Sequence, residues 1–351
     1  MPEPSIWVLC GVRMGDTAQA LELARQVGGS VTPQRLGFTS LHQLPNWLLG
    51  NTIRHLDAKS RALLVPPWPD LIIATGKRTA PVSAWIKEQS GGKAVIVQLG
   101  RPRMALRHFD LIVTTPQYGL PDLSNVARIA LPFAMPKSVP DSVLRHWKER
   151  WQGLPRPLIA AAIGASKFPL RLEAAQLDEF ATALSALARR EGGSALLFSS
   201  PRSDRGAVAR VRSRIEGPCW IQDGEGVGNP YQAGLTLADV FVVTGDSVSM
   251  ASEMIATGKL TYIYPLPRWP TVRWKADHGL VGKLAGRGIL NPPRDVSGFV
   301  DGLIGAGLAA DLRAPGTARP VKVRAADHEA VVAKIRSLMA SRLNERPGST
   351  G

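Results

Sequence analysis

The strongest chemical signal in the sequence is a cluster of hydroxyl and carboxylate side chains where a predicted strand turns into a predicted helix. An apolar run is followed by Thr244, a glycine, Asp246, Ser247 and Ser249. The free backbone N–H groups of a first helical turn and the positive end of the helix dipole form a binding site for phosphate. We therefore predict that an anionic ligand binds where this helix begins, with the hydroxyl groups as additional donors.

The spacing along this helix adds a second contact. Asp246, Met250 and Glu253 stand at i, i+4 and i+7 and share one face, with Glu253 about 10 Å along the axis from the start. That separation suits a diphosphate at the helix tip and a ribose beside Glu253. In the alternative, Asp246 and the serines only cap the helix and Glu253 is a solvated charge. An aspartate at the tip also repels phosphate, so Asp246 is expected to turn away or to bind a sugar hydroxyl.

Three further loops next to predicted strands and helices would bind the same nucleotide. They contain Gly164, Ser166 and Lys167, then Ser200 and Arg202, and then Asn229. A short glycine turn places backbone donors and a lysine charge against a diphosphate. In the alternative, the first two loops are ordinary surface turns and Asn229 is a helix N-cap, with Pro230 at the first helical position.

The first half of the chain offers residues for an acceptor. Arg13, Gly15 and Asp16 follow the first predicted strand and precede a predicted helix. Asp16 is a candidate general base for an acceptor hydroxyl within hydrogen-bond reach. Its alternative role is a simple helix N-cap.

Composition limits the other ligands. The 351 residues carry a formal net charge of +15, which favours anionic partners such as a nucleotide sugar or an anionic membrane surface. The alternative is an arginine-rich composition without a function, because the basic residues are spread over both halves. We expect no nucleic acid, since no basic run is interleaved with aromatic residues. We expect no metal and no other cofactor, since the two cysteines and six histidines show no ligand spacing.

The sequence also bears on localisation. No apolar run approaches the roughly 20 residues of a membrane-spanning helix. The sequence begins without a signal-peptide pattern. These features predict a cytoplasmic protein, and the positive charge extends the prediction to peripheral association at the inner membrane face.

Strand-like apolar runs alternate with helical patterns along both halves, which predicts parallel sheets flanked by helices. We predict an α/β protein with two Rossmann-like, doubly wound domains whose strand ends face one cleft. The expected division is an acceptor-side domain over residues 1–135, a proline-rich linker with a short helix over 136–157, a nucleotide-sugar-side domain over 158–312, and a C-terminal segment over 313–351. The last segment contains a helix that packs back on the N-terminal domain, followed by a mobile tail.

Short motifs spread over most of the chain carry a family resemblance. They are residues 11–16, 69–76, 109–113, 229–231, 238–239, 243–250, 252–253 and 257–259. Together they resemble the "elongated mitochondria" family of mitochondrial-fission proteins and its bacterial members, formerly grouped as a domain of unknown function. The resemblance covers both predicted domains.

The resemblance implies a GT-B-like fold. The helix after Asp246 is also similar to the donor-site helix of GT-B glycosyltransferases, in which a second-turn Glu binds ribose, and by that similarity Glu253 is the ribose ligand. Two positions depart from the family pattern, because residues 200–203 replace an expected basic pair and Gln117 replaces an expected histidine. No catalytic role is therefore transferred to those positions.

These features predict a glycosyltransferase that moves a sugar from a nucleotide sugar to an envelope-related acceptor. The helix beginning at Ser247, with Lys167 or Arg202, would stabilise the departing nucleoside diphosphate without a metal. The alternative, implied by the role of the plant members in mitochondrial division, is a non-catalytic GT-B-like scaffold that recruits partners to a membrane surface. The sugar, the acceptor and the oligomeric state stay open.

Overall fold

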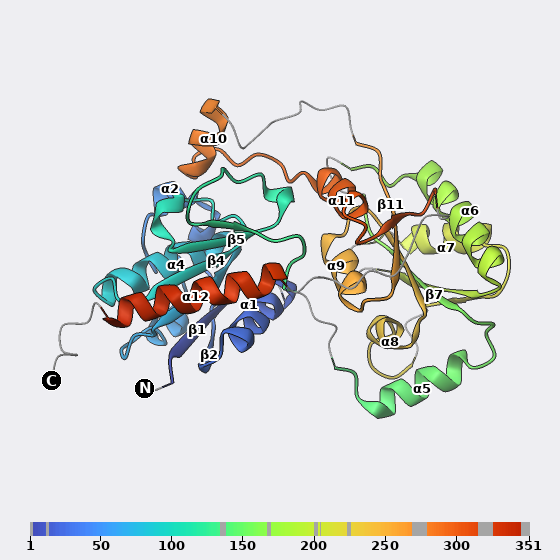
Figure 1. Ribbon diagram of the computed structural model, residues 1–351, viewed down its shortest axis with the longest axis horizontal. Coiled ribbons are helices and arrows are strands. Elements are labelled where there is room, and N and C mark those ends of the chain that lie inside the picture. The colour runs from blue at the N-terminus through green and yellow to red at the C-terminus, as the bar shows by residue number, and fades with distance from the viewer. Residues whose placement is uncertain are drawn as a thin grey trace. The chain divides into compact units, whose positions relative to one another are not determined.

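The chain folds into two compact units, which Figure 1 shows. The computed structural model describes residues 3–11, 14–133, 138–166, 170–199, 203, 205–222, 226–268, 279–314 and 326–344. Unit 1 consists of Met1–Phe133, Arg273–Arg294 and Arg324–Gly351, and unit 2 consists of Ala134–Val272 and Asp295–Val323. Each unit has its own sheet and core.

The sheet of unit 1 has six parallel strands in the order β2-β1-β3-β4-β5-β6. These are β2 (Ser30–Arg35), β1 (Ser5–Cys10), β3 (Leu71–Thr75), β4 (Val95–Leu99), β5 (Leu111–Thr114) and β6 (Val126–Arg128). In the register, Ile6 lies opposite Leu71, and Leu71 lies opposite Val95. The inner strands are continuous apolar runs because helices cover both faces of a parallel sheet.

Two layers of helix enclose this sheet. α1 (Met14–Val27) and α12 (Ala326–Asn344) pack on the face that presents Ile6 and Val8. α4 (Gly76–Gln89) packs on the opposite face, which presents Trp7 and Leu9. α12, red in Figure 1, also packs against α1. Shorter helical elements are η1 (Ser40–Gln43), α2 (Asn46–Leu49), α3 (Ala58–Ala62), η2 (Leu106–His108), η3 (Pro116–Tyr118) and α10 (Gly279–Gly286).

The sheet of unit 2 is also parallel and six-stranded, in the order β12-β11-β10-β7-β8-β9. These are β12 (Ala310–Asp311), β11 (Leu260–Tyr264), β10 (Val240–Thr244), β7 (Leu158–Ile163), β8 (Ser194–Ser199) and β9 (Cys219–Ile221). The helices are α5 (Asp141–Trp151), α6 (Ala174–Glu191), α7 (Arg205–Arg214), α8 (Pro230–Leu237), α9 (Val248–Ala256) and α11 (Val296–Gly305). Two parallel sheets with flanking helices confirm the predicted fold class.

The two faces of this sheet have different coverings. α6 and α7 pack on the face that presents Ile159 and Ala161. The opposite face presents Phe198, which contacts Trp151 of α5 and Tyr231 of α8 through their rings. Along the described ranges, none of the helices has both the length and the apolar character needed to cross a bilayer.

An aspartate directly before a strand recurs at the amino edge of both sheets. Its carboxylate accepts a hydrogen bond from the first or second backbone N–H of the neighbouring strand. The pairs are Asp70 with Ser5 at 2.9 Å, Asp110 with Ile96 at 2.8 Å and Asp239 with Leu158 at 2.8 Å. These bonds satisfy strand ends that would otherwise lack an acceptor, so the aspartates help to fix the strand order.

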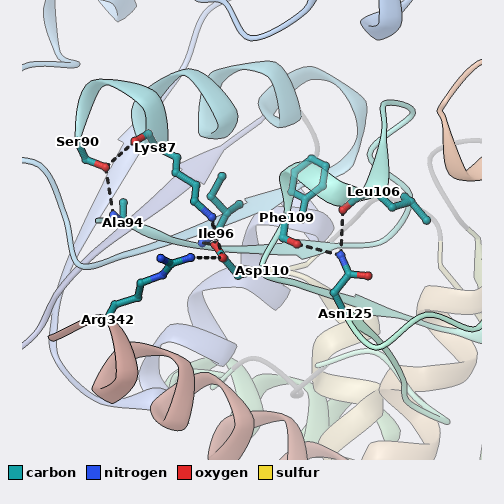
Figure 2. Close-up of polar contacts among 9 residues, drawn as sticks. All are labelled: Lys87, Ser90, Ala94, Ile96, Leu106, Phe109, Asp110, Asn125 and Arg342. Carbon is teal, nitrogen blue, oxygen red and sulfur yellow. Dashed lines mark hydrogen bonds and ion pairs between the residues drawn. The ribbon is translucent and has the colours of Figure 1, made fainter. Parts of the chain in front are cut away.

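Asp110 makes the largest of these networks (Figure 2). Besides the N–H of Ile96, its carboxylate accepts from Nζ of Lys87 on α4 at 2.6 Å and from Nη2 of Arg342 on α12 at 3.4 Å. The Lys87 and Asp110 side chains are largely buried, at 21% and 11% exposure. Asp110 therefore joins β4 to helices on both faces of the sheet.

We predict that Asp110→Ala lowers the free energy of unfolding by about 1–3 kcal/mol, because it leaves a buried N–H and a shielded ammonium without their acceptor. The matched control is Asp122→Ala, whose carboxylate is 89% exposed and pairs with Arg128. That variant should lose less than about 1 kcal/mol. Urea unfolding of both variants checks this, and equal losses would contradict the role given to Asp110.

Candidate functional site

The candidate site begins at the point where the strand order of unit 2 reverses. β7 is the first strand of this sheet in the sequence, and β8 and β9 follow on one side of it. β10 then pairs with the other side of β7. Ligands of open α/β sheets bind outside the carboxyl ends of the strands at such a switch point. The segments that leave β7 and β10 there contain the sequence-predicted residues Gly164 and Thr244–Glu253.

Thr244 connects the two strand ends. Its side chain is fully buried, and its Oγ1 accepts a hydrogen bond from the N–H of Gly164 at 2.8 Å. The same hydroxyl donates to Oδ1 of Asp246 at 2.7 Å. Oδ2 of Asp246 accepts from the N–H of Ala165 at 2.9 Å. Two hydrogen bonds thus join the loop after β7 to the end of β10 and the turn after it, and the third holds Asp246 against Thr244.

This network decides the direction of the Asp246 carboxylate. It points at the loop after β7, and Ser247 rather than Asp246 caps α9. Gly164 allows this approach, because a Cβ at that position would overlap the Asp246 carboxylate. The N–H groups of Gly164 and Ala165, expected to face a diphosphate, already have these acceptors. A direct ligand role for Asp246 and Gly164 stays a prediction.

Ser247 is the cap of α9. Its Oγ accepts from the N–H of Met250 at 3.4 Å, and its side chain is buried. The N–H groups of the first helical turn point out of the helix end, where the dipole is positive. Ser249 is exposed in that turn. The arrangement can therefore present two kinds of donor, backbone N–H and hydroxyl, to an anionic group.

Glu253 lies in the second turn of α9, half-buried, and one oxygen accepts from the Tyr231 hydroxyl at 3.0 Å. Burial and the neighbouring Glu253 carboxylate raise the pKa of the Tyr231 phenol, so it remains a donor throughout the neutral range. Tyr231 follows Asn229, whose side chain caps α8 by accepting from the Tyr231 N–H at 3.0 Å. Asn229 therefore has the geometry of a helix N-cap, which is its alternative role.

The other predicted residues fall into two groups. Ser166 is exposed and its Oγ accepts from the N–H of Leu172 at 3.3 Å, while Gly15 and Asp16 lie in the first turn of α1 in unit 1. The predictions for Arg13, Lys167, Ser200 and Arg202 lie outside the described residues.

Within the described part of the chain, no three His, Cys, Asp or Glu side chains gather in a way that could hold a metal ion.

Sequence reasoning missed two contacts in unit 2. The hydroxyl of Tyr231 donates to Glu253 and so joins α8 to α9, a contact that the sequence motif around Tyr231 does not indicate. Ser203 donates its hydroxyl proton to the carbonyl of Ile163 at 2.6 Å, which brings the loop after β8 to the end of β7. The strand alternation placed both loops at the same edge, but which side chains meet there depends on tertiary packing.

Arg101 is a buried cation of unit 1 that the sequence did not single out. It follows β4, is 8% exposed, and donates through Nη1 to the carbonyl of Pro292 at 2.6 Å. Burial, then Arg103, lowers its pKa to about 10. Arg294 lies over the ring of Tyr118, 4.7 Å from the centroid. The carboxyl edge of this sheet is therefore rich in positive charge.

Two Rossmann-like units, each with a parallel sheet and helices on both faces, define a GT-B-like protein. Residues 14–298 match the family described as mitochondrial fission ELM1. The chain belongs to that family. A Listeria monocytogenes protein described as a UDP-N-acetylglucosamine 2-epimerase by assignment has a similar structure. The TM-score is 0.51, the identity is 9% and 97% of each chain is covered. At that identity the likeness concerns the fold.

Two relatives agree with this membership. A protein of Rickettsia prowazekii, named as uncharacterised, is 25% identical over an alignment of 315 residues, and the match covers 77% of this chain and 86% of that protein. The mitochondrial fission protein ELM1 of Arabidopsis thaliana is 26% identical over an alignment of 220 residues, and the match covers 56% of this chain. The match spans 51% of the plant protein, about half its length.

We predict that Gly164→Ala displaces the Asp246 carboxylate and lowers the free energy of unfolding by about 1–3 kcal/mol, through loss of the bonds to Ala165 and Thr244. The matched control is Gly153→Ala, because a Cβ there meets nothing within 4 Å. Thermal unfolding of the two variants tests this. A Gly164→Ala protein as stable as Gly153→Ala would show that the network does not constrain the site.

Proposed function

We propose that this protein is a nucleotide-sugar-dependent glycosyltransferase whose donor binds at the beginning of α9. The observation that carries the proposal is the meeting of three features at one switch point: a capped helix N-terminus, an aspartate turned aside by Thr244, and a half-buried carboxylate in the second turn. Together they leave an anion site at the helix tip with a hydrogen-bond acceptor beside it.

Each group would have a distinct role in transfer. The first turn of α9, with Ser249 and with Lys167 or Arg202, would stabilise the charge that develops on the departing diphosphate. Glu253, held in place by Tyr231, would accept hydrogen bonds from the ribose hydroxyls. Asp16 is the proposed general base for the acceptor. The proposal needs no metal ion.

The second candidate function is a non-catalytic scaffold that recruits partners to a membrane surface. The family of mitochondrial-fission proteins favours it, and so does the structural use of the site carboxylates. Asp246 accepts from Ala165 and Thr244, and Glu253 accepts from Tyr231, so both side chains already contribute to the stability of the fold. In this reading the protein keeps a donor-site helix without binding a nucleotide.

Calorimetric titration with UDP, GDP, ADP and CMP separates the two functions. We expect saturable binding of at least one nucleotide, and Glu253→Ala should weaken it by about tenfold or more, because a hydrogen bond to a charged group contributes about 1.5–3 kcal/mol. Binding to none of the four, or equal binding by Glu253→Ala, contradicts the proposed donor site.

Two further variants show that the carboxylate itself is responsible. Glu253→Gln keeps an oxygen for the Tyr231 hydroxyl but removes the charge, so it should weaken nucleotide binding while unfolding like the native protein. Glu149→Ala removes an exposed carboxylate from α5 of the same unit and should bind normally. If Glu253→Gln binds as tightly as the native protein, Glu253 has only a structural role.

A further inference from the structure

A short segment of unit 1 exposes an unusual number of large apolar side chains. Ten such side chains are exposed in the part of the chain that the structure describes, and four of them lie within residues 41–48. They are Leu41, Leu44, Trp47 and Leu48, at 43%, 38%, 56% and 59% exposure. We call them the apolar patch. Contiguous exposed apolar side chains mark interaction surfaces, whereas single ones do not.

The patch is held rigidly although its apolar side chains face outward. Asn46, between them, is 2% exposed, and its amide donates to the carbonyls of Lys77 and Pro102, both at 2.7 Å. Nζ of Lys77 donates to the carbonyl of Gln43 at 3.1 Å. A polar side chain points inward and apolar ones point outward, the reverse of the usual pattern. Exposure here is therefore built into the fold.

Basic side chains surround the same segment. Lys77 and Arg78 open α4, the helix that the patch is bonded to, and Arg103 directly follows Pro102. Burial, Arg103 and Arg78 together lower the pKa of Lys77, so the three cations lie within electrostatic reach of one another. Cations in the first turn of a helix oppose its dipole, an arrangement that a neighbouring anion would relieve.

The sequence around these cations has few carboxylates, and the nearby Glu88 accepts a hydrogen bond from the Asn51 amide. Residues 23–56, 71–87 and 89–109 contain neither Asp nor Glu. By contrast, other surface arginines of the protein are paired with carboxylates, such as Arg128 with Asp122 and Arg156 with Asp239. The cations at the patch can therefore attract an anionic partner.

Arg103 is also held in a strained conformation. Its φ of 56° is the left-handed region, and it is the one non-glycine residue with a positive φ in the described ranges. The Arg103 side chain is exposed, so burial of this side chain does not offset the backbone strain. Strained residues persist where the surrounding structure imposes them, often at binding sites.

We propose that the apolar patch, with Lys77, Arg78 and Arg103, is a docking surface for a bilayer of anionic phospholipid. Trp47 and the three leucines enter the boundary between headgroups and acyl chains, and the cations contact the phosphates. Exposed apolar side chains beside cations that have no carboxylate partner in the described part of the chain suit a lipid surface better than a protein groove. This inference concerns unit 1 and stands whether or not α9 binds a nucleotide.

Co-sedimentation of the full chain with vesicles tests the proposal. We expect binding to phosphatidylcholine vesicles that contain phosphatidylglycerol, little binding to phosphatidylcholine alone, and weaker binding as salt increases. The double variant Trp47→Ala, Leu48→Ala should lose about tenfold or more in binding. Arg103→Asn should lose about fivefold, yet melt no lower than the native protein, because asparagine tolerates a positive φ.

Matched controls separate this surface from general charge and general apolarity. Lys93→Asn removes the same charge from the opposite edge of the sheet, before β4, and Leu123→Ala removes an exposed leucine (44%) elsewhere in unit 1. Both should bind vesicles like the native protein. Inorganic phosphate at matched ionic strength should not displace the protein, since a free phosphate does not engage the apolar patch.

Three outcomes would overturn the proposal. One is unchanged vesicle binding by the Trp47→Ala, Leu48→Ala double variant. Another is an equal loss in Lys93→Asn and Arg103→Asn, which would mean attraction by the net charge alone. The third is self-association of the native protein on size-exclusion chromatography that the double variant abolishes, together with no vesicle binding, which would make the patch an interface between copies.

Discussion

The hydroxyl of Thr244 is the constraint on which the candidate site depends. It is buried at the strand reversal of unit 2 and takes part in two hydrogen bonds, accepting from Gly164 and donating to Asp246. It thereby fixes the turn after β10 against the loop after β7. Asp246 is held at the side of the helix entrance, where the Ala165 N–H and the Thr244 hydroxyl stabilise its charge. The repulsion that the Asp246 carboxylate would exert on a phosphate at the tip of α9 is thus reduced.

The motifs of the family resemblance divide between the two edges of the sheets. Asp70, Asp110 and Asp239 stand at amino edges, where each accepts from the backbone of a neighbouring strand. Their presence is explained by strand order and requires no ligand. The motifs around Thr244 and Glu253 stand at a carboxyl edge, where parallel sheets bind ligands. Membership of the family therefore rests on residues of both kinds, and only the second kind bears on chemistry.

The sequence predicted the fold well because apolar runs and helical periodicity are local properties. It also located α9, since a strand, a glycine turn and a hydroxyl cap follow one another. It left open whether Asp246 or Ser247 is the cap, because that choice depends on Gly164, which is distant in sequence. The Tyr231 bond to Glu253 joins two helices and has no local signal. The apolar patch was missed for a related reason: its helical elements are four residues long, too short to show periodicity.

The net charge of +15 acquires a meaning only when the pairing of individual charges is considered. Many surface arginines neutralise carboxylates within their own unit, including Arg25, Arg171, Arg190, Arg210 and Arg313. Such pairs contribute little to stability or to long-range attraction. The residues of α2 and of the first three turns of α4 include no carboxylate, so the cations there have no acidic neighbour along their own helix. A spread of basic residues in the sequence is therefore compatible with a localised excess on the molecule, beside the apolar side chains of residues 41–48.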